Sequence, residues 1–337
     1  RFSTVTGVQT CALPISDRPA PIIRKLNAHW SPKTVFLISA KSTPTVEAGS
    51  NINYTVDYSV NYVNDRDVIA YLPVPTPDPA SFTASYNQHL SLSFKSATQG
   101  GQFTSKAITV DGVNIPANSV YWRLGVQNAG VTGSLGVIFG TKNGTQNGVK
   151  YQANATIVSP NTTAVVSDSD KNIDGNQPTI TKIESTPTPS INKSATGIVL
   201  NNQTHIYSGA PYNSKTTYSA TVKNSYNSRK VETIFNPVIT DDLSDVFAKL
   251  TGVCSVTDPA SRISNISDNG VLNAVNKTIT WRTEHMAPGD QKTLTFMVDY
   301  SGCVKDTEIN NTVNFTSDNT QLKQADKKVI KIGRAHV

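Results

Sequence analysis

The sequence predicts an all-β protein: two tandem Ig-like antiparallel β-sandwich domains joined by a linker rich in Pro, Thr and Asp. Three observations predict this fold. Apolar and polar residues alternate in short runs, long amphipathic helical windows are lacking, and one strand–turn–strand unit occurs twice. Alternation with a period of two means that each strand buries one face, so the strands need packed sheets.

The repeated unit is clearest from Thr278 to Tyr300. Apolar residues around Trp281 alternate with polar ones, a turn follows at Pro288-Gly289, and a second alternating strand comes next. The stretch from Ser119 to Phe139 has the same features in the same order, with Trp122 in the place of Trp281. A unit that recurs at this separation predicts two copies of one domain.

The two ends of the sequence read as one DNA oligonucleotide in opposite orientations. One back-translation of Val5 to Ser16 ends in ACGTGTGCTCTTCCGATCT, and one back-translation of Lys331 to Val337 contains the reverse complement of that sequence. This oligonucleotide resembles a sequencing-library adapter. We therefore expect residues 1–16 and 330–337 to be adapter-derived scars that carry no information about the fold.

Charge and composition favour an extracellular protein and exclude some partners. Without Arg1, Lys331 and Arg334 the formal net charge falls from +6 to +3, which gives nucleic-acid binding little support. Charged residues make up only 16 % of the chain, and Asn, Thr, Ser and Val are abundant. No apolar run approaches the roughly 18 residues of a membrane span.

The first domain is expected at residues 34–160, after an irregular Pro-containing flank at 17–33. Four prolines between Pro73 and Pro79 predict a loop or an edge, because proline cannot occupy a central strand. The expected strands are 35–40, 51–62, 67–73, 90–94, 107–115, the strand around Trp122, 135–139 and 151–158.

Residues 161–189 are expected to form the linker, a semi-extended spacer that ends in Ser-Thr-Pro-Thr-Pro-Ser. The second domain is expected at residues 190–329, with one short helical turn at 241–248. Its expected strands are 190–193, 216–224, 231–241, 250–256, the two strands of the repeated unit and 309–315.

Two cysteines remain once the ends are set aside, Cys254 and Cys303. An even pair in an extracellular protein predicts one disulfide, which would stabilise the domain by roughly 3–4 kcal/mol in the chain-entropy model. The alternative is a pair of free thiols. Their spacing does not suit a metal site.

Several motifs of the second domain are together similar to the DUF11-type repeat, a β-sandwich module of bacterial and archaeal cell-surface proteins. The matching residues are Tyr218 and Asn224, Asp241-Asp242-Leu243, Ile279-Thr280-Trp281, Met286-Ala287-Pro288-Gly289 and Ile309-Asn310-Asn311-Thr312. The first domain resembles the family more loosely, through Gly49 and Tyr54, Ser119 to Arg123 and Leu135 to Phe139, and it lacks the Pro-Gly turn. The resemblance implies a stalk or adhesin role at the cell surface and names no ligand.

Cell-wall sandwich domains of this general kind often link a first-strand Lys to a last-strand Asn, with a buried acid assisting. Lys193, Asn311 and Asp241 each share a strand face with apolar neighbours, so all three are expected to point inward. Burial lowers the pKa of a Lys and raises that of an Asp, which are the protonation states that the reaction needs. The alternative is a solvated Lys193 and an Asn311 that serves a local hydrogen-bond network.

Asn310 is the second choice of partner for Lys193. In the first domain, Lys41 and Asn154 are the residues that would play the same parts.

Asp168, Asp170, Asn172 and Asp174 place oxygen ligands at alternate positions, a spacing that suits Ca²⁺. The stretch departs from the EF-hand loop, because Ile173 stands at the glycine position and Thr179 at the position of the bidentate Glu. The alternative to a calcium site is a polar linker without metal. No other cofactor is expected.

No catalytic constellation is found, so the chain is expected not to be an enzyme. The histidines outside the ends, His29, His89, His205 and His285, are scattered, and no nucleophile elbow is present. Trp122 and Trp281 are expected in the core rather than as sugar-stacking platforms.

The sequence thus predicts a non-catalytic structural or adhesive stalk fragment of a larger prokaryotic cell-surface protein. Its expected partners are neighbouring domains of the same chain and a host or cell-surface glycan or protein. The alternative is a carbohydrate- or protein-binding module that uses loops at one sandwich end, such as Pro73 to Pro79.

Overall fold

The computed structural model describes residues 33–332 except 63, 87–88, 201–202, 208–213, 227–229 and 304–306. Within these residues the protein is almost entirely antiparallel β-structure, with one α-helix, α1 (Ser244–Gly252), and three short 3-10 helices, η1 (Pro79–Ser81), η2 (Ala84–Tyr86) and η3 (Pro259–Arg262). The all-β prediction is confirmed. None of the described helices has the length and apolar character to cross a membrane.

Two sandwiches follow one another along the chain. The strands of the first are β1 (Val35–Ser42), β2 (Thr45–Glu47), β3 (Asn51–Asn61), β4 (Asp65–Pro73), β5 (Thr76–Pro77), β6 (Ser93–Ala97), β7 (Gln102–Thr104), β8 (Ile108–Val110), β9 (Val113–Ile115), β10 (Ser119–Gln127), β11 (Thr132–Gly140), β12 (Lys150–Ala153), β13 (Thr156–Ser159), β14 (Thr162–Val166) and β15 (Thr179–Glu184). Those of the second are β16 (Pro189–Ala195), β17 (Ile198–Leu200), β18 (Gln203–Tyr207), β19 (Lys215–Asn224), β20 (Val238–Asp242), β21 (Ile263–Ser264), β22 (Val271–Asn273), β23 (Thr278–Arg282), β24 (Gln291–Asp299), β25 (Thr307–Ser317) and β26 (Thr320–Ile332).

Two sheets of the first sandwich match the two sheets of the second in strand order, and the first also has a sheet of order β2-β15-β12-β5 and the pair β8–β9. One sheet has the order β1-β3-β11-β6 in the first sandwich and β16-β19-β24-β21 in the second. The other has the order β14-β13-β4-β10-β7 in the first and β26-β25-β20-β23-β22 in the second, where the β17–β18 hairpin extends the sheet at β26. The repeated strand–turn–strand unit of the sequence is therefore one part of a repeated domain.

Each sandwich encloses its own apolar core, and a tryptophan lies in each core. Trp122 and Trp281 are fully buried, as expected from their place among alternating apolar residues. Each indole Nε1 donates a hydrogen bond to a backbone carbonyl, that of Thr98 at 2.8 Å and that of Ser267 at 2.9 Å. A buried Trp needs such a partner for its N–H, so these residues are core anchors.

The stretch predicted to be a linker, 161–189, contains two strands. β14 pairs with β13, and β15 pairs with β12. In the second sandwich one long pair, β25 with β26, takes the place of these two short pairs. Thr179, Thr181 and Ile183 alternate inward along β15, and two of these three residues are polar, so the sequence did not reveal the strand. Residues 185–188 are all that separates the paired strands of the two sandwiches.

The sequence predicted a single helical turn within 241–248 and a strand at 250–256. Helix α1 instead runs through both segments, from Ser244 to Gly252. Val246, Phe247 and Leu250 are its buried residues, and their spacing of three and four places them on one helical face. The strand predicted at 231–241 is confined to β20, because Phe235 and the residues before it form the connection at the end of the sandwich. The expectations for residues 1–32 and 333–337 lie outside the described residues, while 330–332 belong to β26.

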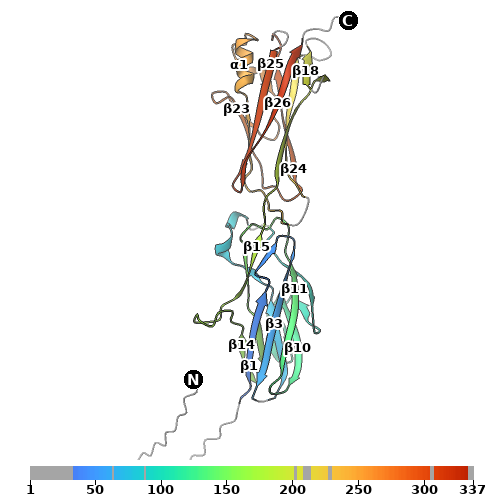
Figure 1. Ribbon diagram of the computed structural model, residues 1–337, viewed down its shortest axis with the longest axis vertical. Coiled ribbons are helices and arrows are strands. Elements are labelled where there is room, and N and C mark those ends of the chain that lie inside the picture. Colours follow the sequence, from blue (N-terminus) through green and yellow to red (C-terminus); the bar gives the residue numbers. More distant parts are fainter. Residues whose placement is uncertain are drawn as a thin grey trace, which may run out of the picture.

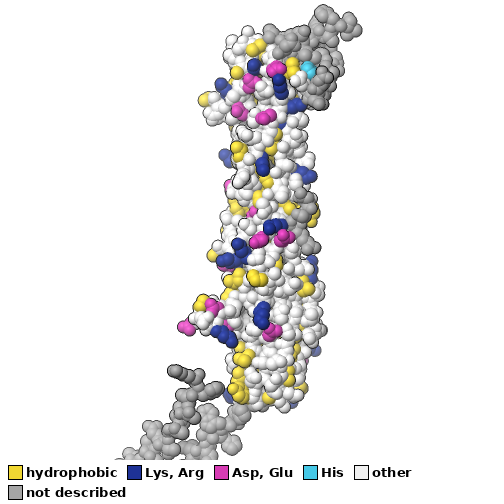
Figure 2. Space-filling model, viewed as in Figure 1, with side chains coloured by type: hydrophobic (Ala, Val, Ile, Leu, Met, Phe, Trp, Pro, Cys, Tyr) yellow, Lys and Arg dark blue, Asp and Glu magenta, His cyan; other side chains and the backbone are white. Residues whose placement is uncertain are grey.

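The two sandwiches lie end to end and form a long, narrow molecule (Figure 1). The described chain enters at the free end of the first sandwich and leaves at the opposite end of the second. On the face seen in Figure 2, basic and acidic side chains are few and intermixed.

Candidate cross-linking site

Lys193 lies in the middle of edge strand β16 and points into the second sandwich. Along this strand Lys193 alone is buried, and its backbone pairs with Ala220 of β19. The lysine side chain is fully shielded from solvent. A buried lysine is rare unless it has a partner or a reaction to perform.

The partner of Lys193 comes from the opposite sheet. Asp241 lies on β20, between β23 and β25, and its side chain is also fully buried. Its Oδ2 atom contacts Lys193 Nζ directly across the sandwich interior. The pair therefore joins an edge strand of one sheet to a central strand of the other.

Asn311 completes the group from β25, the strand beside β20. It lies two residues before Val313, whose backbone pairs with Asp241, and its side chain is buried. The Asn311 side chain interacts with the Asp241 carboxyl group and partly offsets the rise in its pKa that desolvation causes. At normal hydrogen-bond geometry neither Asn311 Oδ1 nor Nδ2 has a partner among the described residues. The carboxamide is thus left available beside the Lys193–Asp241 pair.

Aromatic rings surround the lysine amine. Lys193 Nζ lies 5.4 Å from the ring centroids of both Tyr218 and Phe296. The Tyr218 hydroxyl forms a hydrogen bond of 2.8 Å with that of Tyr300, and both tyrosines are fully buried. These rings keep water away from the three polar side chains, so the environment has a low effective dielectric constant.

The pKa shifts of the pair follow from this burial. Desolvation lowers the pKa of Lys193, although the nearby Asp241 opposes the change. Desolvation raises the pKa of Asp241, and the opposing influences are Lys193 and then Asn311. Both directions favour a neutral amine next to a protonated carboxyl group.

The first sandwich provides a comparison at the same three positions. The two sandwiches can be aligned through their buried tryptophans. The carbonyls of Thr98 and Ser267 accept the indole hydrogen bonds, and the N–H groups of the same two residues donate to the carbonyls of Gly136 and Thr295. Leu135 and Leu294, one residue earlier, are therefore equivalent. The row Lys193–Ala220–Leu294 then corresponds to the row Ala40–Val56–Leu135.

The facing sheets align in the same way. Trp281, Ile239 and Phe315 form one cross-strand row, and Trp122, Ala70 and Ile157 form the matching one. Two residues on from Ala70 in β4, Leu72 takes the position of Asp241. Four residues before Ile157, Ala153 takes the position of Asn311, although this count passes from β13 to β12, which together correspond to β25. Lys193, Asp241 and Asn311 are thus replaced by Ala40, Leu72 and Ala153, all buried.

The other candidate partners are placed differently. Lys41 lies on the outer face of the first sandwich, where its side chain is 74 % exposed and bonds to Asp57 at 3.0 Å, so it does not reach the interior where the oxygen of Asn154 is buried. Asn310 is exposed, and its backbone N–H donates to Asp245. Because side chains alternate between the two faces of β1, Ala40 points into the sandwich and Lys41 points to solvent.

The two cysteines meet at the outer end of the second sandwich. Cys254, just after α1, forms a disulfide with Cys303, which closes a loop with a sequence separation of 49. The bond connects the helical segment to the chain between β24 and β25.

The Asp168–Asp174 stretch forms a loop between β14 and β15. Asp168 Oδ1 accepts bonds from the N–H groups of Asp170 and Gln177, and Asp170 Oδ1 accepts bonds from the backbone and side chain of Asn172. In the part of the chain that the structure covers, no three His, Cys, Asp or Glu side chains gather as a metal site would need. The calcium site stays a prediction.

The Pro73–Pro79 segment lies at the end of the first sandwich that faces the second. Part of it is β5, which pairs with β12, and the N–H of Asp78 donates to the carbonyl of Lys150 at 2.7 Å. The segment is therefore held against the sheet by backbone bonds.

No family model and no curated protein matches the chain. Among solved structures, the chain is similar to the C-terminal domain of the AgI/II polypeptide BspA of Streptococcus agalactiae, with 7 % identity, a TM-score of 0.27 and coverage of 87 % of this chain and 100 % of that one. It is also similar to a variant of BcpA, the major pilin subunit of Bacillus cereus, with 12 % identity, a TM-score of 0.26 and coverage of 89 % and 70 %. Similarities this remote do not bear on function.

Proposed function

We propose that this chain is a non-catalytic stalk segment of a prokaryotic cell-surface protein, in which the second sandwich is closed by an amide bond between Lys193 and Asn311. The observation that carries the proposal is the buried group of Lys193, Asp241 and Asn311, which spans the two sheets. A rod of two end-to-end sandwiches suits a spacer that holds something away from a surface. The resemblance of the second-sandwich motifs to the DUF11-type repeat supports the same function.

The proposed reaction needs no co-reactant. The neutral Lys193 amine attacks the carboxamide carbon of Asn311, while the protonated Asp241 carboxyl donates a hydrogen bond to the carbonyl oxygen. The attacking amine gives up one proton, which Asp241 passes to Asn311 Nδ2. The bond between the carboxamide carbon and Nδ2 then breaks, and Nδ2 leaves as ammonia. One amide replaces another, so nothing is oxidised or reduced.

The position of the bond explains what it would do. Lys193 lies on β16, the first strand of the second sandwich, and Asn311 lies on β25, near its other end in sequence. Pulling on the two ends of this domain would load the covalent bond before the strands between them could separate. The stalk would thereby resist force and proteolysis.

Intact mass spectrometry of the reduced full chain tests this function. We expect the mass to be lower than the calculated value by one ammonia. The variants Lys193→Ala and Asn311→Ala should each have their full calculated mass, because each removes one reactant. Lys41→Ala is the matched control and should keep the deficit, since Lys41 lies outside the sandwich. A wild-type chain of full mass would refute the cross-link.

A further inference from the structure

The end of the second sandwich that faces the first is a docking face built around an aromatic contact. Tyr86 of η2 stacks on Phe235, with ring centroids 3.9 Å apart and an angle of 8° between the planes. His285 stands edge-on to both rings at 5.4 Å. The Tyr86 hydroxyl donates to Asp318 and accepts a bond of 3.0 Å from Asn236 Nδ2.

Backbone hydrogen bonds hold the same junction. The N–H of Gly144 donates to the carbonyl of Val231, and the N–H of Lys230 donates to that of Ala48, both at 2.9 Å. Buried Glu232 accepts a bond of 2.9 Å from the N–H of Asn147. These contacts make a specific interface rather than a chance approach of two domains.

The free end of the first sandwich is the equivalent of this docking face. Asp65 pairs with Gln127 in the first sandwich, and Ile234 pairs with Met286 in the second. Each of these backbone pairs lies five residues along both strands from the pair that contains the buried tryptophan, so the two pairs are equivalent. Arg66 therefore takes the place of Phe235, and the residue after it, Asp67, takes that of Asn236. Asp67 and Asn236 share a left-handed backbone, with φ of 56° and 49°. Val126 takes the place of His285.

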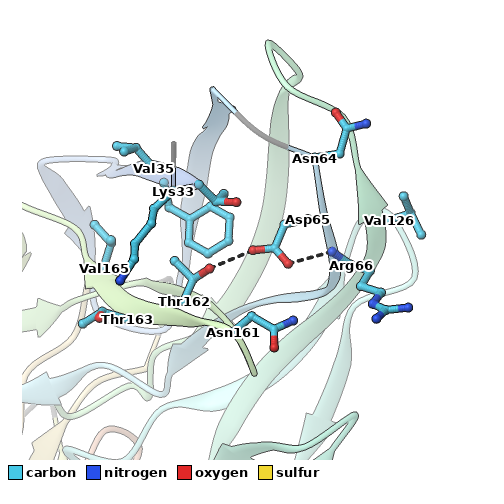
Figure 3. A pocket seen from close by; sticks show the side chains of 12 residues that line it. Lys33, Val35, Asn64, Asp65, Arg66, Val126, Asn161, Thr162, Thr163 and Val165 are labelled. Atoms are coloured by element: carbon cyan, nitrogen blue, oxygen red, sulfur yellow. Dashed lines mark hydrogen bonds between the residues drawn. The ribbon is translucent and has the colours of Figure 1, made fainter. Parts of the chain in front are cut away.

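The three residues at these positions are exposed, and two of them, Arg66 and Val126, line a hollow surface. Val126 is 71 % exposed, and Arg66 and Asp67 are also exposed. A groove of about 700 Å³ lies here between the ends of the two sheets, with Asp65 at its centre (Figure 3). Asp65 accepts a bond of 2.8 Å from the Thr162 hydroxyl and one of 2.7 Å from the Arg66 N–H, which fixes the loop that carries Arg66.

We propose that this end of the first sandwich binds the Tyr86-type end of another sandwich of the same kind. The chemistry of the face matches an incoming tyrosine. The position of Asp318 is occupied by Pro160 in the first sandwich, because the pair Ser159–Thr162 corresponds to the pair Ser317–Thr320. Pro160 has no side-chain acceptor, so the Asp67 carboxylate accepts the hydrogen bond of the phenol hydroxyl instead. The Arg66 guanidinium stacks on the ring in place of Phe235, and Val126 supplies the apolar side.

A three-sandwich fusion tests this inference. In the fusion, residues 1–33 are replaced by a second copy of residues 34–186. Thr186 of this added copy is joined directly to Thr34 of the original first sandwich and so occupies the position of Lys33. A connection this short gives the added end an effective concentration on the order of millimolar, enough for a modest interface to form. The probe is Val126→Cys in the original first sandwich, and the reference is the full chain with Cys11→Ser and the same probe.

The measured quantity is the alkylation rate of the probe cysteine by a small maleimide. We expect the added sandwich to slow the reaction by about tenfold or more, because docking buries the side chain and reaction then needs local opening. A cysteine at Val275, 89 % exposed at the far end of the second sandwich, should react equally fast in both proteins. Tyr86→Ala in the added copy should restore fast alkylation of the Val126 probe.

Equal alkylation rates with and without the added sandwich would overturn the proposal. A slow rate that persists after Tyr86→Ala would overturn the assigned aromatic contact. Neither result would touch the Lys193–Asn311 cross-link, which lies inside the other sandwich.

Discussion

At the scale of single residues, the second sandwich carries a polar group that its own fold does not require. The first sandwich fills the same three positions with Ala40, Leu72 and Ala153, and packs a complete core around them. Burying a lysine and a carboxyl group usually costs more free energy than an apolar set of similar volume. Chemistry between the side chains gives a reason for Lys193, Asp241 and Asn311 to be there.

This comparison supplies a variant that removes the reaction without leaving a charge in the core. The triple substitution Lys193→Ala, Asp241→Leu and Asn311→Ala copies the first sandwich. We expect it to fold with full calculated mass and to lose about 2–5 kcal/mol of unfolding free energy, taking the loss of a native disulfide from a small domain as the measure of a lost cross-link. Denaturant unfolding measures the loss, and stability equal to wild type would argue against a cross-link.

At the scale of elements, the sequence predicted the central strands well and the segments between the domains poorly. Alternation around Trp122 and Trp281 identified β10 and β23, and parity alone put Lys193, Asp241 and Asn311 on inward faces. The sequence did not predict β15, because its inward residues include threonines. Strand pairing is set by contacts distant in sequence, so the equivalence of Ala40 and Lys193 emerged only from the register.

The connection before β20 contains a buried acid whose ionisation affects the junction. Desolvation raises the pKa of Glu232 from its ordinary value of 4.5, so the folded state binds a proton more readily than the unfolded chain. Its contribution to stability is therefore fully present below about pH 4.5 and is lost as the pH rises through the folded-state pKa.

Glu232→Gln should remove this pH dependence and keep the acceptor for the Asn147 N–H. We expect the variant to be more stable than wild type at pH 7 and to show a smaller change in melting temperature between about pH 4 and pH 7. Calorimetry at the two pH values checks the prediction. An identical pH profile in both proteins would show that Glu232 is not responsible.

At the scale of the whole molecule, the junction determines whether two sandwiches behave as one rod. The Tyr86–Phe235 stack, the bonds of the Tyr86 hydroxyl with Asp318 and Asn236, and the backbone bonds between the ends all fix one orientation. The sandwiches are thereby held end to end (Figure 1). Only residues 185–188 connect the paired strands, so there is little slack in the chain itself. A rigid junction would let the molecule act as a spacer of fixed length.

Tyr86→Ala should weaken this rod without unfolding either sandwich. A stacked aromatic pair contributes about 0.5–1.5 kcal/mol beyond its buried area, and the variant also loses the hydroxyl bonds. Small-angle X-ray scattering should then show a broader distribution of interdomain distances than in wild type. Leu37→Ala, at an exposed site on β1, is the control and should leave the scattering unchanged. A Tyr86→Ala rod as straight as wild type would mean that the backbone bonds alone fix the junction.

The central claim is the covalent bond inside the second sandwich, and tandem mass spectrometry of a proteolytic digest tests it most directly. The account predicts a branched species in which the peptide containing Lys193 is joined to the peptide containing Asn311, with the loss of one ammonia. The Asp241→Asn variant should yield the two peptides separately, because the proton donor is absent. Separate, unmodified Lys193 and Asn311 peptides from the wild-type chain would contradict the account.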